Sequence, residues 1–374
     1  MQSDHYRLHG LDHLRATAIL GVMLYHYRAL YGLPIRWLEP IGRIGWAGVD
    51  LFFVLSGFLI ARKLFEEVKT TDQINLGRFY ISRALRILPA YWSTLAIYFF
   101  LPVTQEGAGI QPLWRFLTFT QNFNFNPYRT TFSHAWSLSV EEHFYLLFPL
   151  LLLLVFRQRW RLSWLIFPAV LMLGIGLRWW AWRSAVAPML TEASQLRAAF
   201  VTVYYPTYTR LDGLLVGVGL AAIATWRPDL IHKLHTLGDW LLPPALACLG
   251  IAFWLFGGPV TSPYFATLPT LLFGFPILSI GFGLLVLAAI NPNSFWGGQK
   301  FAPSYGLATI SYAIYLIHKI INHMVNTLVV LNTVSLFLLS FFLTIAAGAV
   351  LYTLIESHFL RFRTHPLAKA EKSS

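Results

Sequence analysis

An arginine and a histidine lie inside the first long apolar stretch of the chain, residues 11–31. Arg15 and His26 are eleven positions apart, a spacing that returns to within roughly 20° of the same helix face and separates the two by roughly 16 Å. Ionisable groups inside a membrane span are costly and usually functional. The pair therefore predicts a fixed cation and a titratable base on one face of one helix. The alternative is structural: Arg15 would extend its side chain to the membrane interface, and His26 would be an interior polar group with its hydrogen bonds satisfied.

Acidic side chains are expected at a similar depth in three later apolar stretches. If the N-terminus is cytoplasmic, Asp50, Glu141 and Asp212 fall in the outer third of their predicted spans, as His26 does. Buried charges need partners, so a shared polar cavity is the economical arrangement. We expect His26 to act as a general base with Glu141 as its supporting carboxylate, and Asp50 to be a further catalytic candidate.

Other polar and aromatic residues lie close to these acids in the sequence. Trp136 precedes Glu141 and Arg210 precedes Asp212. We expect Trp136, Arg210 and Asp212 to bind the substrate. Polar groups in the last two predicted spans are expected to be structural; these are His318, Lys319 and Glu356.

Two more arginines are predicted on the cytoplasmic side of the membrane. Arg83 and Arg86 are three positions apart, hence neighbours on one helix face. Two guanidinium groups at a membrane surface suit a phosphate group. Plain anchoring by positive charge on the inner side of the membrane remains the alternative.

Composition restricts the class of protein. Of 374 residues, 56% are hydrophobic and only 12% are charged, against about 25% charged in a soluble chain. This is the composition of a polytopic membrane protein. The net charge of +12 comes mostly from loops between apolar spans, where basic residues face the cytoplasm and anionic lipid headgroups, so we expect no nucleic-acid partner. The lone cysteine, Cys248, excludes a disulfide within the chain, and no metal site is expected.

The apolar pattern predicts an all-α bundle of about ten transmembrane helices. They form one integral membrane domain over residues 1–374, with spans between about 11 and 356 and a short tail at 357–374. The excess of basic residues in alternate loops places both termini in the cytoplasm and the protein in the inner membrane as a multi-pass protein. The candidate spans are 11–31, 43–62, 88–103, 133–156, 162–182, 204–226, 238–256, 266–290, 306–330 and 334–356.

Motifs along nearly the whole chain resemble the acyltransferase 3 family of integral membrane acyltransferases. Each motif alone is weak, but their order and spacing are specific. They are Arg15-x10-His26, GVDLFFVLSGFLI at 48–60, RFYISRALRILPAYW at 78–92, HAWSLSVEEHFYLLFP at 134–149, RLDGLLVG at 210–217, ISYAIYLIH at 310–318, and Glu356.

The resemblance implies about ten membrane helices, an acyl-CoA donor that is usually acetyl-CoA, and a hydroxyl acceptor that is most often on a carbohydrate or glycoconjugate. It strengthens the functional interpretation of Arg15, His26, Arg83, Arg86 and Glu141, and with an acyl-CoA donor we expect the three arginines to bind the phosphates of this cofactor. Many family members keep only the first glutamate of the pair at 141–142. Some carry an additional esterase-like domain, and we expect this chain to work without one.

The rival hypothesis is a transporter or flippase without chemistry, in which polar groups at mid-membrane line a path. Matching broken helices in two halves would favour it, and the sequence has none that we recognise. A lipid-binding structural protein is a third possibility, but it leaves the buried histidine and glutamate unexplained. Membrane lipids surround the protein in all three.

Overall fold

The protein is a bundle of helices in the computed structural model, which describes residues 8–125, 130–157, 165–259 and 262–362. Within these ranges the chain has helices and no strand, as the all-α prediction requires. The tail predicted beyond residue 362 lies outside the described residues. The long helices are α1 (His9–Tyr31), α3 (Gly48–Thr71), α4 (Leu76–Phe100), α6 (Trp136–Arg157), α7 (Ile166–Ala181), α9 (Asp212–Trp226), α11 (Leu242–Phe256), α12 (Phe275–Ala289), α14 (Ala302–Leu328) and α15 (Thr333–Leu351). The shorter ones are α2 (Glu39–Ile44), α5 (Leu113–Leu117), α8 (Glu192–Ala199), α10 (Pro228–His235), α13 (Phe295–Gly298) and α16 (Ser357–Phe362).

The predicted number of about ten membrane spans is not confirmed. Among the described residues, five helical runs are long and apolar enough to cross a bilayer, or six if α9 and α10, bent by 104°, count as one. The difference has a physical cause. Helix α4 carries several arginines, and α7 and α9 have 16 and 15 residues, roughly 24 Å or less against a bilayer core of about 30 Å. The five runs are Arg36–Thr71, Ser133–Phe156, Gly238–Phe256, Thr270–Ala289 and Thr333–Phe362.

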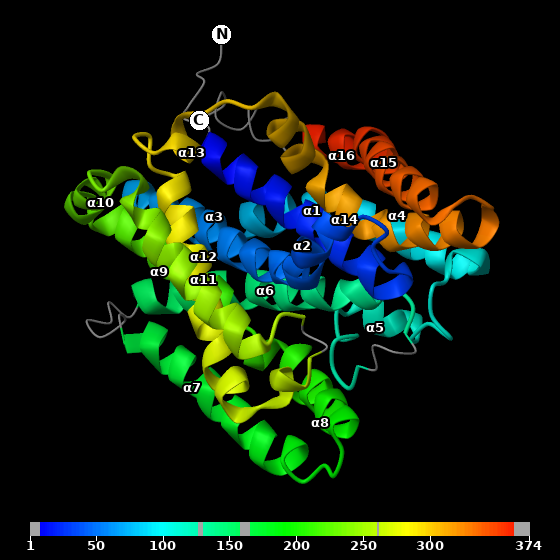
Figure 1. Ribbon diagram of the computed structural model, residues 1–374. Coiled ribbons are helices and arrows are strands. Elements are labelled where there is room, and N and C mark those ends of the chain that lie inside the picture. The colour runs from blue at the N-terminus through cyan, green and yellow to red at the C-terminus, as the bar shows by residue number, and fades with distance from the viewer. Residues whose placement is uncertain (1–7, 126–129, 158–164, 260–261, 363–374) are drawn as a thin grey trace.

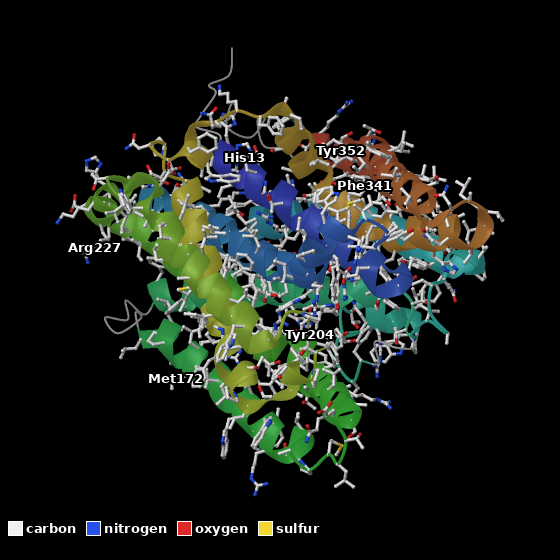
Figure 2. The ribbon with its side chains drawn as sticks, in the orientation of Figure 1. His13, Met172, Tyr204, Arg227, Phe341 and Tyr352 are labelled. Atoms are coloured by element: carbon white, nitrogen blue, oxygen red, sulfur yellow. The ribbon has the colours of Figure 1, made fainter. Side chains whose placement is uncertain are left out.

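The helices are arranged as one bundle with α1 packed against α14, and α14 against α15 (Figure 1). Helices α9 to α12 lie toward one edge in this view, and α7 and α8 form the lower edge. The outer surface is apolar: Met172 of α7 projects from it, whereas Tyr204 is buried (Figure 2). Such a surface faces lipid in a membrane protein. Further large apolar side chains on it are Leu146, Leu147, Leu150, Leu154, Leu173, Leu338 and Phe342.

The most extensive contact between two described helices is that of α3 with α9, and it depends on glycine. A Cβ atom on Gly57 would lie 2.1 Å from the carbonyl oxygen of Leu214, and one on Gly217 would lie 2.2 Å from that of Val54. Neither distance is compatible with a side chain. Small residues let membrane helices approach closely, so these two glycines hold α3 against α9 and fix the position of the residues on both helices.

Local sequence features determine where α4 begins and which residues share a face of α14. The Asn75 side chain accepts a hydrogen bond from the Arg78 backbone N–H at 2.9 Å and so caps α4, which fixes the start of the helix that carries Arg83 and Arg86. On α14, Tyr315 and His318 are three positions apart and share a face of the helix.

Candidate active site

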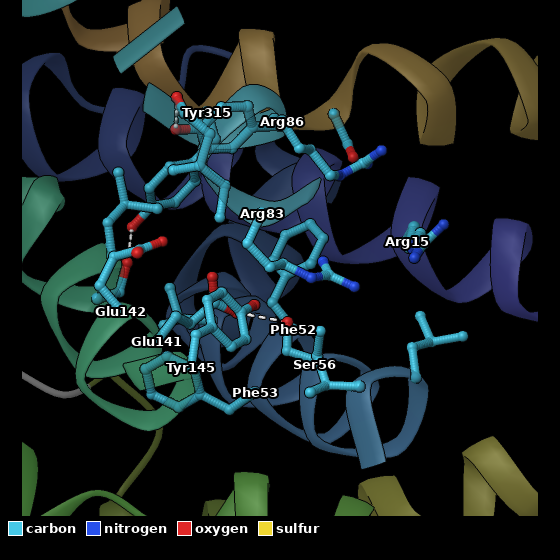
Figure 3. Close-up of a pocket in the computed structure, with 18 residues that line it drawn as sticks. Arg15, Phe52, Phe53, Ser56, Arg83, Arg86, Glu141, Glu142, Tyr145 and Tyr315 are labelled. Carbon is cyan, nitrogen blue, oxygen red and sulfur yellow. Dashed lines mark hydrogen bonds between the residues drawn. The ribbon is translucent and has the colours of Figure 1, made fainter. Parts of the chain in front are cut away.

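A cavity of about 340 Å³ lies between five helices (Figure 3). Helix α1 contributes Arg15, and the other walls come from α3, α4, α6 and α14. The lining is both charged and apolar, as expected for a site that holds a ligand with a polar end and an uncharged arm. The other lining residues are Val49, Phe52, Phe53, Ser56, Leu59, Ile60, Arg83, Arg86, Ile87, Ser137, Leu138, Glu141, Glu142, Tyr145, Ser311, Tyr312 and Tyr315.

One side of the cavity is cationic. Arg15 from α1 and Arg83 and Arg86 from α4 lie on the same side of it (Figure 3). The Arg83 guanidinium lies 5.5 Å from the centroid of the Tyr145 ring, which restricts its position. Three guanidinium groups at one end of a cavity suit an anionic ligand with several phosphate oxygens. The structure thus brings together the three arginines that the sequence predicted to bind the cofactor.

The opposite side is acidic. Glu141 and Glu142 project from α6 across from the arginines (Figure 3). The Ser56 hydroxyl donates a hydrogen bond to Glu141 at 2.5 Å. Because carboxylates repel phosphates, an anionic ligand can place its phosphates only at the arginine end, and its uncharged part then extends along the glutamates. Ser56 was not singled out from the sequence, although it lies within the predicted motif at 48–60.

Beyond the glutamates, the cavity ends at Ser137 and Tyr315. Their hydroxyl groups are hydrogen-bonded to each other, and the Tyr315 hydroxyl also donates to the backbone carbonyl of His134 at 2.8 Å. Neither residue was predicted from the sequence as part of the site, although the motifs at 134–149 and 310–318 contain them.

Three histidines lie behind this end wall. The Nδ1 atom of His26 is 3.0 Å from Nε2 of His318, and the His134 ring lies 6.1 Å from His26 and 4.7 Å from His318 between centroids. His134 and His318 are fully buried, whereas His26 keeps part of its surface exposed. Within the described residues, no group of three or more histidine, cysteine or acidic side chains has the arrangement of a metal site.

His26 and Glu141 therefore have different neighbours. The described hydrogen bonds of the His26 ring go to His318 and to the Val22 carbonyl, whereas Glu141 binds Ser56. His26 is also not among the residues that line the cavity. None of these described hydrogen bonds joins His26 to Glu141, so the supporting role of Glu141 stays a prediction.

The remaining predicted site residues do not line the cavity, and the charged ones among them form buried ion pairs. Asp50 accepts from Arg210 at 2.6 Å, and both side chains are at least 97% buried. The Arg210 guanidinium is enclosed by aromatic rings, with Phe275 at 4.0 Å and Trp136 at 5.2 Å. Instead of one shared polar cavity, the acids are divided between the cavity and these pairs. The catalytic role of Asp50 and the substrate-binding roles of Trp136 and Arg210 stay predictions.

Asp212 pairs with an arginine that sequence reasoning missed. Arg178 of α7 is fully buried and makes two hydrogen bonds to the Asp212 carboxylate, at 2.5 and 3.1 Å. No local pattern links the two residues, because they are on different helices. The substrate-binding role expected of Asp212 also stays a prediction.

Replacing Asp50 with alanine is expected to lower the free energy of unfolding by ~3–5 kcal/mol, because it leaves the buried Arg210 cation without its anionic partner. The measurement is the melting temperature of the purified protein in detergent. The control is Glu66→Ala, which removes the Arg62–Glu66 pair, whose side chains are 38% and 54% exposed; this change should cost less than ~1 kcal/mol. Equal melting temperatures for the two variants would contradict the prediction.

A family model described as an acyltransferase domain matches residues 8–353, so the chain belongs to the acyltransferase 3 family. This confirms the resemblance drawn from the motifs and favours an enzyme over a transporter. The O-acetyltransferase OatA of Staphylococcus aureus strain NCTC 8325 is 29% identical over 384 aligned residues, covering 96% of this chain and 58% of the relative. A putative O-acetyltransferase of S. aureus strain COL is 27% identical over 379, covering 94% of this chain and 57% of the relative.

The chain thus spans somewhat less than three-fifths of the length of these curated relatives. No solved structure matches it.

Proposed function

We propose that the protein transfers an acetyl group from acetyl-CoA to a hydroxyl of a carbohydrate or glycoconjugate at the inner membrane, with both termini in the cytoplasm. The family and the printed names of the relatives support acyl transfer to oxygen. The observation that carries the choice of donor is the cavity, in which arginines from two helices face two glutamates.

Acetyl-CoA fits this charge distribution. Its phosphates would bind Arg15, Arg83 and Arg86 by charge-assisted hydrogen bonds. Its uncharged pantetheine arm would extend past the glutamates toward Ser137 and Tyr315, which brings the thioester to the part of the cavity nearest to the histidines.

The reaction follows from the chemistry of a hydroxyl, which is a poor nucleophile at neutral pH. His26 accepts the proton of the acceptor hydroxyl as its oxygen attacks the thioester carbonyl. The carbon–oxygen bond forms, the carbon–sulfur bond breaks, and coenzyme A leaves as a thiolate that takes the proton from His26. The products are an O-acetyl ester and free coenzyme A, without a change of oxidation state.

The test is transfer of the labelled acetyl group from acetyl-CoA by the purified full chain in liposomes, with a panel of mono- and oligosaccharide acceptors. We expect an acceptor-dependent, labelled ester and stoichiometric release of coenzyme A. Acetyl-CoA left intact with every acceptor, by protein that is folded and monodisperse, would contradict the proposal.

We also predict that donor and acceptor reach the site from opposite faces of the membrane. His26 does not line the arginine cavity, yet the residue is partly exposed, and we expect the acceptor to reach it from outside that cavity. In sealed vesicles with acetyl-CoA on the cytoplasmic face, an impermeant acceptor should be acetylated only when it is on the other face. Transfer only to acceptor on the cytoplasmic face would place both substrates behind one opening.

A further inference from the structure

We infer that His318 is a positioning residue that helps to hold His26 in the tautomer whose lone pair is on the accessible nitrogen, Nε2. The inference rests on the proposed function, because it assigns a partner to the base of that reaction. It starts from the hydrogen bonds of the two rings, which determine where each imidazole hydrogen lies.

The hydrogen of His318 is on Nδ1. This atom lies 2.8 Å from the backbone carbonyl oxygen of Tyr315, and a carbonyl can only accept. The side chain has no exposed surface, and none of its hydrogen bonds within the described residues goes to a carboxylate. A neutral ring with its hydrogen on Nδ1 has a lone pair on Nε2. His318 therefore presents an acceptor to His26.

This acceptor and the backbone carbonyl of Val22 together determine the tautomer of His26. Nδ1 of His26 lies 3.0 Å from Nε2 of His318, which carries the lone pair, and 3.1 Å from the carbonyl oxygen of Val22. Both neighbours accept, so Nδ1 of His26 must carry the hydrogen. The lone pair of His26 is then on Nε2.

That lone pair is open to a substrate. Within the described part of the chain, no hydrogen bond reaches Nε2 of His26, and this atom is not among the fully buried polar atoms without a partner, whereas Nδ1 of His134 is. His26 is also partly exposed as a residue, unlike His134 and His318. Of the three histidines, His26 is thus the one with an accessible proton acceptor.

The arrangement also stabilises the charged intermediate of the reaction. When Nε2 of His26 takes the hydroxyl proton, its Nδ1–H becomes a cationic donor to His318, and such bonds are about twice as strong as neutral ones. The proton then leaves from Nε2 of His26 to the coenzyme A thiolate, and His318 keeps its own hydrogen throughout. Without His318, only the Val22 carbonyl still favours the Nδ1–H form, so the Nε2–H form gains population, and this form cannot accept a proton at Nε2.

Two substitutions of His318 distinguish a role in positioning His26 from a role in packing alone. His318→Leu fills a similar volume without an acceptor, whereas His318→Gln retains an amide oxygen that can accept from His26. His323→Leu, on the same helix and partly buried, is the matched control. We expect His318→Leu to lower kcat about 100-fold with the donor KM unchanged, His318→Gln to recover at least about tenfold of that loss, and His323→Leu to match the wild type.

The tautomer itself is measured by nitrogen-15 NMR of the histidine-labelled protein, with the His26 signals assigned by their loss in His26→Ala. We expect the Nδ1–H form in the wild type and in His318→Gln, and a mixture in His318→Leu. Equal loss of activity in the Leu and Gln variants, or an Nε2–H form in the wild type, would overturn the inference. If His318→Leu does not fold, the spectra of the other two proteins decide. If the wild type transfers no acetyl group, the proposed function fails, while the spectra still test the inference.

Discussion

Replacing His26 with alanine should lower acetyl transfer by about 10³-fold, within the range of 10²–10⁴ that a general base contributes. The reason is that the partly exposed His26 ring has its accessible nitrogen free to take the acceptor proton, whereas His134 and His318 are buried and hydrogen-bonded to backbone carbonyls. The measurement is kcat for labelled transfer in liposomes, and the donor KM should stay the same because His26 does not line the arginine cavity.

The control for this variant is His323→Ala, which removes a histidine of the same bundle without touching the cluster. Size-exclusion chromatography and the melting temperature in detergent establish that each variant is folded. A well-folded His26→Ala protein with near-normal turnover would remove His26 as the base, and with it the positioning role of His318.

Replacing both Arg83 and Arg86 with alanine should raise the KM for acetyl-CoA by about 100-fold or more, because each hydrogen bond between charged groups contributes about 1.5–3 kcal/mol. The two side chains line the same end of the cavity. The acceptor KM should not change. The control is Arg78→Ala, on the same helix but exposed and outside the cavity lining.

A truncated donor sharpens this test. Acetyl-pantetheine lacks the phosphates of the nucleotide part, so the wild type should use it far less well than acetyl-CoA. The double variant should discriminate much less between the two donors, because only Arg15 of the three arginines remains to recognise the phosphates. Discrimination as strong as in the wild type, or a change in the acceptor KM alone, would show that the arginines do not bind the donor.

Helix geometry was sufficient for predictions within one element. The three-residue spacing of Arg83 and Arg86 predicted a shared face, and both line the cavity. The eleven-residue spacing of Arg15 and His26 predicted a common face, but only Arg15 lines the cavity. The axial separation of roughly 16 Å takes His26 past the end wall at Tyr315, which belongs to a helix almost 300 residues later in the sequence.

Partners between helices could not be predicted in this way. Their predicted depth in the membrane suggested that Asp50 and Asp212 share a cavity with His26. Depth in the membrane does not determine which helices are neighbours. The close contact of α3 with α9 brings Asp50 to Arg210, 160 positions away. Arg178 occupies the equivalent place for Asp212. The all-α class followed directly from composition, whereas the number of spans did not, because several of the helices are short or charged.

The charge separation in the cavity has a consequence for how the enzyme would respond to metabolism. If the arginines hold the donor by its phosphates, they hold free coenzyme A equally well, because substrate and product carry the same phosphates and differ only at the far end, beside Ser137 and Tyr315. Product would then compete with substrate at every turnover. The rate of acetylation would follow the ratio of acetyl-CoA to coenzyme A in the cytoplasm rather than the acetyl-CoA concentration alone, which would couple modification of the acceptor to the carbon supply of the cell.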